Sequence, residues 1–323
     1  MNRQPYRLVT KCDLDGLACG LLLKEMALID RIAFAHPRDI ESGRLAITAD
    51  DITAGLPYRE TAHLAFDHYP SRAATTSNTG NLVLDQRMSS TSRVIYHHYG
   101  REHFQRISPD MLEAVDRGVG ANISIDEILY PTGWMLLHHL IDHRTGLERF
   151  KPLSTSTPEL IRYLLDYWRD HTIWDILSLP DVEERLQLYF SCVDRCKDQI
   201  LRCASVYDNL VVTDMRMEQV IYPGNRFMIY ALFPECNLSL QVTADSVGDK
   251  TVFVVSKSNL DRSYARDIGE ILEQYGGGGH ANAGTCQCRS DQADEVLARL
   301  NGELRYSPLK NLFLGYFNYY RYR

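Results

Sequence analysis

The sequence predicts an α/β protein: an N-terminal, doubly wound and mostly parallel sheet, a helical connector, and a smaller C-terminal α+β domain. Short apolar runs alternate with helical patterns over the first 120 residues, and this alternation is typical of a parallel sheet. After residue 208, strand-like runs follow one another more closely. The length of 323 residues suits two domains, because domains usually hold roughly 100–200 residues.

The first part of the chain alternates strands with helices. Strands are expected at residues 6–10, 32–35, 45–48, 63–66 and 81–84. Helices are expected at residues 17–27 and, after serine and threonine caps, at residues 89–99. Ligands of such sheets bind beyond the carboxyl ends of the strands, so polar residues that follow strands are the first candidates for a site.

The rest of the chain divides into a helical stretch and a second strand-rich region. Helices are expected at residues 134–141, 158–170 and 180–206, from their apolar spacing. Further strands are expected at residues 209–213, 219–221, 226–233, 238–243, 251–256 and 284–288, and further helices at 263–274 and 292–303. We therefore place domains at 1–150 and 206–303, a helical connector at 151–205, and an aromatic and basic tail at 304–323.

Composition excludes several classes of protein. The net charge of -7 argues against binding to long duplex nucleic acid, which needs a basic face. The eight cysteines do not form the framework of a small secreted protein. Neither a signal segment nor an apolar run of membrane length is present in the sequence. We therefore expect a cytoplasmic protein that does not interact with membranes.

Two carboxylates follow the first expected strand. Asp13 and Asp15 precede Gly16, which permits a tight turn into the next helix. On an extended segment, side chains two residues apart point to the same side, about 6–7 Å apart. Two such oxygen donors suit Mn²⁺ or Mg²⁺. Taken alone, the pair is more typical of a turn with a helix-capping aspartate.

Three further places carry acids or histidine. Asp51 belongs to the pair Asp50-Asp51 after the run at 45–48. Asp67 and His68 follow the run at 63–66, and Asp116 lies near the end of the apolar stretch 111–118. Each alone is more typical of a cap, a turn or a structural histidine. Together they are expected at one edge of one sheet, where cations relieve their repulsion, and two metal ions suit phosphoryl transfer.

A glycine run marks the second domain. Four glycines at 276–279 are followed by His280. Consecutive glycines let backbone N–H groups approach an anion closely. His280 and Lys257 could add positive charge to a phosphate site. The alternative is a flexible loop without a ligand.

Taken in order, these features resemble the DHH phosphoesterase superfamily with a C-terminal DHHA1 domain, which includes RecJ-like, nanoRNase and exopolyphosphatase-like proteins. Asp13-Leu14-Asp15-Gly16 resembles the first motif, Asp51 the second-motif acid, Asp67-His68 the motif that names the family, and Asp116 the fourth. The glycine run with His280, Ala283 and Gly284 is similar to the DHHA1 signature and is the most specific part. The resemblance spans residues 5–300 and identifies 1–150 as the DHH domain and 206–303 as the DHHA1 domain.

The resemblance also implies a site. It implies two Mn²⁺ ions, with Mg²⁺ as the alternative, bridged by Asp51. Asp15, His68 and Asp116 would complete one metal site and Asp13 would serve the other, while Asp67 would orient His68 or support the site. The substrate would be held by residues of the second domain: Lys257, Gly277, Gly278, Gly279, His280 and Asn282.

Two positions depart from the family's pattern. Lys11 stands where the first motif usually has a metal-binding histidine, and Tyr69 stands where the named motif usually has a second histidine. One metal site therefore keeps all its ligands, while the other is left with Asp13 and the bridge. Tyr69 can hydrogen-bond a phosphate oxygen but is a poor proton donor near neutral pH. Asp67 and Tyr69 are the candidate catalytic residues.

The first hypothesis for function is hydrolysis of short linear oligonucleotides or dinucleotides, such as pGpG, by a metal-activated water. The second is hydrolysis of polyphosphate or of a small phosphorylated nucleotide. The basic residues near the glycines are few for a polyphosphate channel: Lys257, Arg262, Arg266 and Arg289. The third is a catalytically weak, nucleotide-binding regulatory module, against which the retained acids and His68 count. Whether the chain forms a homodimer stays open.

Overall fold

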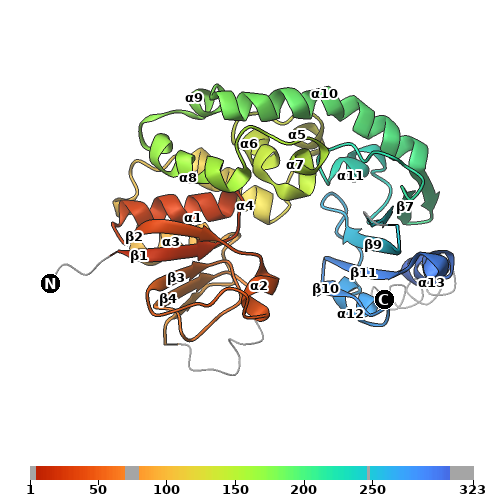
Figure 1. The fold of residues 1–323 in the computed structure, drawn as a ribbon, viewed down its shortest axis with the longest axis horizontal. Coiled ribbons are helices and arrows are strands. Elements are labelled where there is room, and N and C mark those ends of the chain that lie inside the picture. The colour runs from red at the N-terminus through yellow and green to blue at the C-terminus, as the bar shows by residue number, and fades with distance from the viewer. Residues whose placement is uncertain (1–4, 70–79, 246–247, 306–323) are drawn as a thin grey trace, which may run out of the picture. The chain divides into compact units, whose positions relative to one another are not determined.

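The computed structural model describes residues 5–69, 80–245 and 248–305. The chain forms two compact units, Met1–Ser191 (unit 1) and Cys192–Arg323 (unit 2) (Figure 1). The division falls within one long helix, α10 (Pro180–Cys203). From residue 306 on, the predicted aromatic tail lies outside the described residues. Within the described ranges, no helix is long and apolar enough to span a membrane.

Unit 1 is built on a five-stranded parallel sheet in the order β2-β1-β3-β4-β5. Its strands are β1 (Tyr6–Thr10), β2 (Ile29–Phe34), β3 (Asp51–Ala54), β4 (Leu64–Asp67) and β5 (Leu82–Leu84). Thr10 pairs with Ala54, and Ala54 pairs with Phe66, so β1, β3 and β4 end level with one another. This confirms the parallel sheet that the sequence predicted and defines its carboxyl edge.

Helices cover this sheet and continue to the end of unit 1. They are α1 (Leu14–Glu25), α2 (Pro37–Glu41), α3 (Thr91–Tyr99), α4 (Pro109–Val119), α5 (Ile125–Leu129), α6 (Gly133–Ile141), α7 (Leu147–Phe150), α8 (Thr157–Tyr167) and α9 (Ile173–Leu177). α1 contacts β1 and β2 as well as α3, α4, α6 and α8. Ten consecutive residues of α1, from Leu14 to Leu23, are buried. A helix that is buried on every side is central to its unit, so α1 carries the residues at its start on a rigid support.

The third strand does not lie where the sequence predicted it. Residues 45–48 form no strand, and β3 begins at Asp51. Ile47 instead packs with Val9 of β1 and Ile40 of α2 in a small apolar cluster. The apolar residues of 45–48 therefore fill space beside the sheet, and the chain turns between Thr48 and Asp51 before the strand begins.

Unit 2 contains a six-stranded mixed sheet in the order β10-β11-β9-β8-β7-β6. Its strands are β6 (Ala204–Tyr207), β7 (Leu210–Asp214), β8 (Leu238–Ala244), β9 (Lys250–Lys257), β10 (Gly278–His280) and β11 (Ala283–Arg289). β7 and β8 are parallel, and the other neighbours are antiparallel. The α+β prediction for this region is confirmed.

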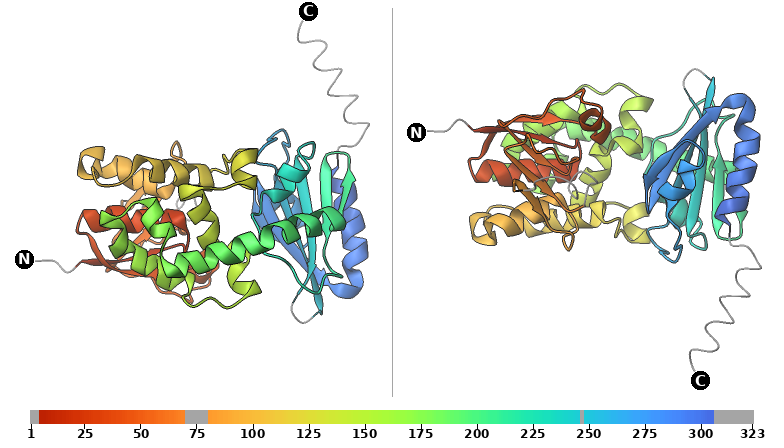
Figure 2. Two further views of the ribbon diagram at one scale, coloured as in Figure 1. Left: turned by 90° about the horizontal axis from the view of Figure 1, so that it is seen from above. Right: turned by 90° about the horizontal axis from the view of Figure 1, so that it is seen from below.

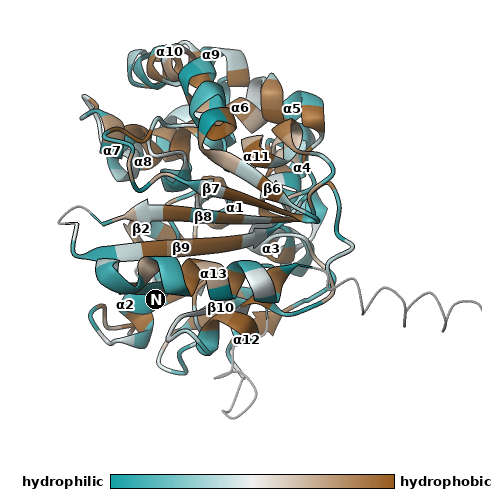
Figure 3. Cartoon of the chain, turned by 90° about the vertical axis from the view of Figure 1, so that its right-hand side faces the viewer, coloured by the Kyte–Doolittle hydropathy of each residue, from teal (hydrophilic) through white to brown (hydrophobic). Residues whose placement is uncertain are grey.

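Two helices close one face of this sheet. Alternate residues of β7, β8 and β9, such as Leu240 and Phe253, form one apolar cluster with α12 (Ile268–Glu273) and α13 (Ala293–Leu304). Figure 2 shows α13 lying along the sheet, and Figure 3 shows the apolar character of β7, β8 and β9. This cluster fixes β9, β11 and α12 around the glycine run.

Two further strand predictions for unit 2 are wrong. Residues 226–233 form a short helix, α11 (Met228–Leu232), and residues 219–221 form no strand. The run around Met228 is apolar throughout and is buried, so its sequence shows no period that separates a strand from a helix. Asn225 accepts a hydrogen bond from the backbone of Phe227 through its side chain (2.9 Å), which favours the turn into α11.

Candidate active site

The carboxyl end of β1 leads directly into α1. Asp13 is the N-cap of α1, and its Oδ1 accepts a hydrogen bond from the backbone N–H of Gly16 (2.9 Å). A Cβ atom at Gly16 would lie 2.0 Å from the carbonyl oxygen of Lys11. Only glycine therefore lets the first turn of α1 pack against the end of β1 in this way. The Asp-Leu-Asp-Gly sequence thus fixes both carboxylates beside the carboxyl edge of the sheet.

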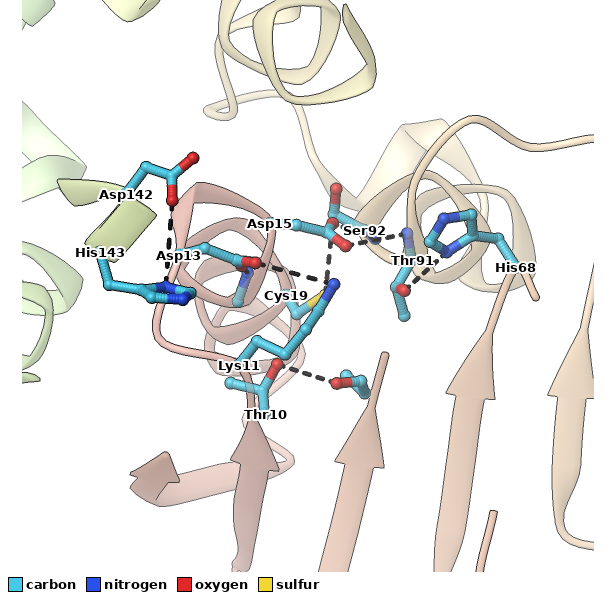
Figure 4. A network of polar contacts seen from close by, with 12 residues as sticks. Thr10, Lys11, Asp13, Asp15, Cys19, His68, Thr91, Ser92, Asp142 and His143 are labelled. Carbon is cyan, nitrogen blue, oxygen red and sulfur yellow. Dashed lines mark hydrogen bonds and ion pairs between the residues drawn. The ribbon is translucent and has the colours of Figure 1, made fainter. Parts of the chain in front are cut away.

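Asp15 connects α1 to α3. Its buried carboxylate accepts hydrogen bonds from the backbone N–H groups of Thr91 (3.2 Å) and Ser92 (2.9 Å). These N–H groups belong to the first turn of α3, where backbone donors lack partners within the helix. Figure 4 shows Asp15 reaching Ser92, and Thr91 lying next to His68. Asp15 therefore holds α3 against the site.

His68 follows β4 and is buried. Its Nδ1 lies 2.9 Å from Oγ1 of Thr91. Its Nε2 is buried without a hydrogen-bond partner among the described residues. Burial lowers the pKa of His68, with the neighbouring Asp15 acting in the opposite direction. A neutral imidazole with one nitrogen fixed and the other unpaired is the usual state of a histidine that binds a metal ion.

Asp67 lies at the end of β4 beside His68. Its Oδ1 accepts hydrogen bonds from the backbone N–H groups of His68 (2.8 Å) and Tyr69 (3.0 Å). Burial raises the pKa of Asp67 to about 6, although these two hydrogen bonds oppose the rise. The side chain of Tyr69 is 61% exposed, and its ring lies 4.3 Å from the ring of His68.

Lys11 follows β1 directly. Its Nζ lies 3.7 Å from Oδ2 of Asp13. The charge of Asp13 raises the pKa of Lys11 despite partial burial, and Asp15 and Asp67 add to the rise. Burial alone would raise the pKa of Asp13, but Lys11 and the N–H of Gly16 lower it overall. Lys11 is therefore an ammonium among three carboxylates.

The donors around His68 suit a divalent cation. The carboxylates of Asp13 and Asp67 remain partly exposed, at 20% and 14%, and Nε2 of His68 has no hydrogen-bond partner among the described residues. Carboxylate oxygen and imidazole nitrogen together suit Mn²⁺. Within the described ranges, no three His, Cys, Asp or Glu side chains are already arranged to hold an ion. Binding an ion here therefore requires these side chains to move toward it.

Asp51 does not belong to this group. The prediction that it lies at the carboxyl edge is wrong, because Asp51 is the first residue of β3 and pairs with Arg7, near the start of β1. Its buried carboxylate accepts hydrogen bonds from Nε (2.7 Å) and NH2 (2.9 Å) of Arg7 and from the backbone N–H of Thr48 (2.8 Å). These interactions lower the pKa of Asp51 against the effect of burial. At this end of the sheet, Asp51 joins two segments of unit 1.

Among the described residues, Asp116 contacts the start of α3 and not the residues around His68 directly. It belongs to α4, where its Oδ1 accepts a hydrogen bond from Oγ of Ser90 (2.6 Å) and its Oδ2 from Nε of Arg93 (2.8 Å). Ser90 is the N-cap of α3. As the side chains lie here, Asp116 holds the first turn of α3, which in turn contacts Asp15 and His68.

An acidic and basic group that the motifs do not predict follows α6. Asp142 and His143 lie beside Asp13 (Figure 4). The carboxylate of Asp142 accepts hydrogen bonds from Nε of Arg144 (2.7 Å), and Arg144 lowers the pKa of Asp142 although burial opposes it. Arg144 and His138 also help to lower the pKa of Asp13. The signal available in the sequence was the run Asp-His-Arg directly after an apolar helix.

In unit 2, the glycine run forms an edge strand. Gly276 makes a turn at φ 69° after α12, and Gly278 begins β10. A Cβ at Gly277 would lie 2.2 Å from the carbonyl oxygen of Thr285, and one at Gly279 would lie 2.3 Å from that of Ala283. The run is therefore ordered by close packing against β11. Among the described atoms, only open space surrounds the Cβ position of Gly278.

The other predicted substrate residues gather at one end of this sheet. Lys257 ends β9, His280 ends β10, and Asn282 lies in the turn before β11. The backbone N–H of Lys257 donates to the carbonyl oxygen of Asn282 (2.9 Å). The backbone N–H of Asn282 donates to Nδ1 of His280 (3.3 Å), and Nζ of Lys257 lies 5.8 Å from the ring centre of Tyr264.

Neither a protein-family model nor a curated protein matches the chain. Among solved structures, the chain is similar to the pGpG-specific phosphodiesterase PggH from Vibrio cholerae, with a TM-score of 0.82 and 44% identity over 93% of this chain and 98% of that chain. It also matches an exonuclease RecJ bound to manganese (TM-score 0.48, 13% identity, 94% of this chain and 92% of that chain). A third match is CDC45 from Entamoeba histolytica (TM-score 0.47, 9% identity, 93% and 95%). At these scores the last two matches bear on neither fold nor function.

The parallel sheet with carboxylates at its carboxyl edge, the mixed sheet with a glycine-rich edge strand, and the near full-length similarity agree. The chain belongs to the DHH phosphoesterase superfamily and, within it, to the family of the Vibrio cholerae phosphodiesterase. The resemblance that the sequence motifs indicated is thereby confirmed.

Proposed function

We propose that this chain is a metal-dependent phosphodiesterase that hydrolyses pGpG and similar dinucleotides to mononucleotides. The observation that carries the proposal is the 44% identity to a pGpG-specific phosphodiesterase over 93% of this chain and 98% of that chain. At this identity and coverage, both units and their connection are shared. The net charge of -7 agrees with a short substrate, since long nucleic acids favour basic proteins.

In this proposal, Asp13, Asp15 and His68 hold a divalent cation, which we expect to be Mn²⁺, with Mg²⁺ as the alternative. The unpaired Nε2 of His68 and the partly exposed carboxylate of Asp13 support this assignment. A bound ion would supply charge stabilisation to the phosphoryl group and acidify a water. We assign no ligand role to Asp51 and Asp116, because their carboxylates pair with Arg7 and Arg93.

Asp67 is the residue that we propose to accept a proton from the attacking water. Its Oδ1 is held by two backbone N–H groups, which orients the carboxyl group and leaves Oδ2 for the proton. A pKa near 6 suits a general base that works near neutral pH. The hydroxyl of the exposed Tyr69 would donate a hydrogen bond to a phosphate oxygen.

Unit 2 is proposed to bind the rest of the substrate. Lys257 and His280 would bind the second phosphate of the dinucleotide, and Asn282 could hydrogen-bond the nucleotide. Their positions at the ends of β9 and β10 and in the turn between β10 and β11 support a common site. The open space around Gly278 would let a ligand approach the backbone of β10 closely.

The test is a comparison of substrates with purified protein and Mn²⁺ or Mg²⁺. We expect pGpG to be converted to GMP, a longer oligonucleotide to be cleaved much more slowly, and polyphosphate to remain intact. Asp67→Asn should reduce kcat by roughly 10²–10⁴-fold, the usual contribution of a general base. The exposed Asp30 provides a matched control, Asp30→Asn. Faster breakdown of polyphosphate, or binding of pGpG without turnover, would overturn the proposal.

A further inference from the structure

Lys11 occupies the place where a cation is needed. Its Nζ lies 3.7 Å from Oδ2 of Asp13, and Figure 4 shows the amine between Asp13 and Thr91. A lysine amine that pairs with a carboxylate is an ammonium near neutral pH. A positive charge is therefore already present among the residues that would hold an ion.

The end of β3 is shaped around this lysine. Gly55 follows β3, the strand between β1 and β4, so it lies between the strands that lead to Asp13 and to His68. A Cβ at Gly55 would lie 3.1 Å from Cε of Lys11 and 3.0 Å from Oγ1 of Thr91, and the backbone has φ 64°. A side chain at this position would press against Lys11 and Thr91, and the positive φ also disfavours any residue other than glycine. Residues 52–59 contain no other acid that could bridge two ions at this edge.

We propose that Lys11 replaces a second metal ion: the site binds one divalent cation, and the Lys11 ammonium binds a nonbridging oxygen of the scissile phosphate. The charges agree with this assignment, because one divalent ion and one ammonium balance the carboxylates of Asp13, Asp15 and Asp67. A second divalent ion would leave an excess positive charge beside Lys11. The part of the proposal that concerns the phosphate rests on the proposed phosphodiesterase function.

The first experiment measures Mn²⁺ binding to the full-length protein without substrate, by titration calorimetry. We expect one ion per chain at the site. Lys11→Gln should keep this stoichiometry and bind Mn²⁺ roughly tenfold more tightly, because a neighbouring positive charge has been removed. Two ions per wild-type chain, or weaker Mn²⁺ binding by Lys11→Gln, would overturn the proposal. Lys24→Gln is the matched control, since Lys24 lies in the exposed last turn of α1 and pairs with Asp166.

The second experiment measures turnover of pGpG by the same variants. Lys11→Gln should lower kcat/KM by about 10²-fold, the usual loss when one group that stabilises a developing charge is removed. Activity would therefore fall while metal affinity rises, a pattern that loss of structure does not produce. If kcat/KM and the affinity for Mn²⁺ both fell, Lys11 would only support the fold.

Gly55→Ala tests the space for Lys11 without changing any charge. The new Cβ should displace Lys11 and reduce kcat/KM, whereas Gly43→Ala should leave it unchanged. Both glycines have positive φ, but no described atom lies within 4 Å of the Cβ position of Gly43. If Gly55→Ala and Gly43→Ala have the same kcat/KM, Lys11 has not been displaced and the proposed role of Lys11 is contradicted. If wild-type protein binds one Mn²⁺ but does not cleave pGpG, the proposed function fails while the single-ion assignment stands.

Discussion

Replacement of Asp51 by alanine separates a role in the fold from a role in metal binding. The carboxylate of Asp51 accepts two hydrogen bonds from Arg7 and two from Thr48. Asp51→Ala would leave the guanidinium of Arg7 and the backbone N–H of Thr48 without this partner at the start of the sheet. We therefore expect a loss of stability, with the metal site left intact.

The expected loss in the free energy of unfolding follows from how deeply the ion pair of Asp51 with Arg7 is buried. The Asp51 side chain is 1% exposed and the Arg7 side chain 31% exposed. Removing one partner of a fully buried ion pair costs about 3–5 kcal/mol, while exposed pairs contribute about 1 kcal/mol or less. An intermediate pair should cost about 2–3 kcal/mol. For a unit of this size, that loss lowers Tm by roughly 5–10 °C.

The assay combines thermal unfolding with Mn²⁺ binding and pGpG turnover measured well below Tm. Asp50→Ala is the matched control, because Asp50 is the exposed neighbour of Asp51. The double variant Arg7→Met with Asp51→Ala should be more stable than Asp51→Ala alone, since no unpaired charge remains. An unchanged Tm together with loss of Mn²⁺ binding would refute this reasoning and restore Asp51 as a metal ligand.

Two other predictions concern the glycine strand and the site acid. Gly279→Ala should lower the free energy of unfolding by about 1–3 kcal/mol, because its Cβ would lie 2.3 Å from the carbonyl oxygen of Ala283. Gly278→Ala should lower it less, because no described atom lies within 4 Å of its Cβ position. Equal losses of the two variants in urea unfolding would contradict the packing of β10. With a chelator present, stability should rise as the pH falls from 7 to 5, because Asp67, with a pKa of about 6, takes up a proton in the folded chain before the unfolded chain does. Asp67→Asn should abolish this rise, and a rise that persists in the variant would assign it to another group.

Local sequence was enough to predict the start of the site. Asp13, Asp15 and Gly16 act within one helical turn, so the spacing that identified them also determines their geometry. Asp67 and His68 were found for the same reason, since they directly follow a strand whose position was nearly right. The parallel sheet itself followed from alternation of strands with helices, which does not depend on the exact bounds of each strand.

The sequence predictions were wrong or incomplete where contacts between distant residues determine the local structure. The apolar run at 45–48 predicts a strand, but its Ile47 packs against Val9 and Ile40, and β3 is the less apolar segment that follows. This shift of a few residues moved Asp51 from one edge of the sheet to the other. Asp142 was missed because its proximity to Asp13 depends on the packing of α6, which no local pattern encodes.

The glycine run shows a different limit. Glycines carry no side-chain pattern, so a cradle for an anion, a loop and an edge strand are alike in sequence. The structure shows an edge strand, in which Gly277 and Gly279 are required for close packing and Gly278 is not. Ligand binding is therefore best sought at Gly278 and at the strand end that carries His280.

The position of Asp51 and the presence of Lys11 have one common consequence. With Asp51 paired to Arg7 at the amino end of β3, the carboxyl end of that strand offers Gly55 in place of a bridging acid. A pair of metal ions without a bridging carboxylate would repel each other across this gap. Lys11 fills the same gap with a single charge, and Gly55 leaves room for it. If Asp51→Ala lowers Tm and leaves Mn²⁺ binding intact, the missing bridge is established, and a single ion with Lys11 is the arrangement that balances the remaining carboxylates.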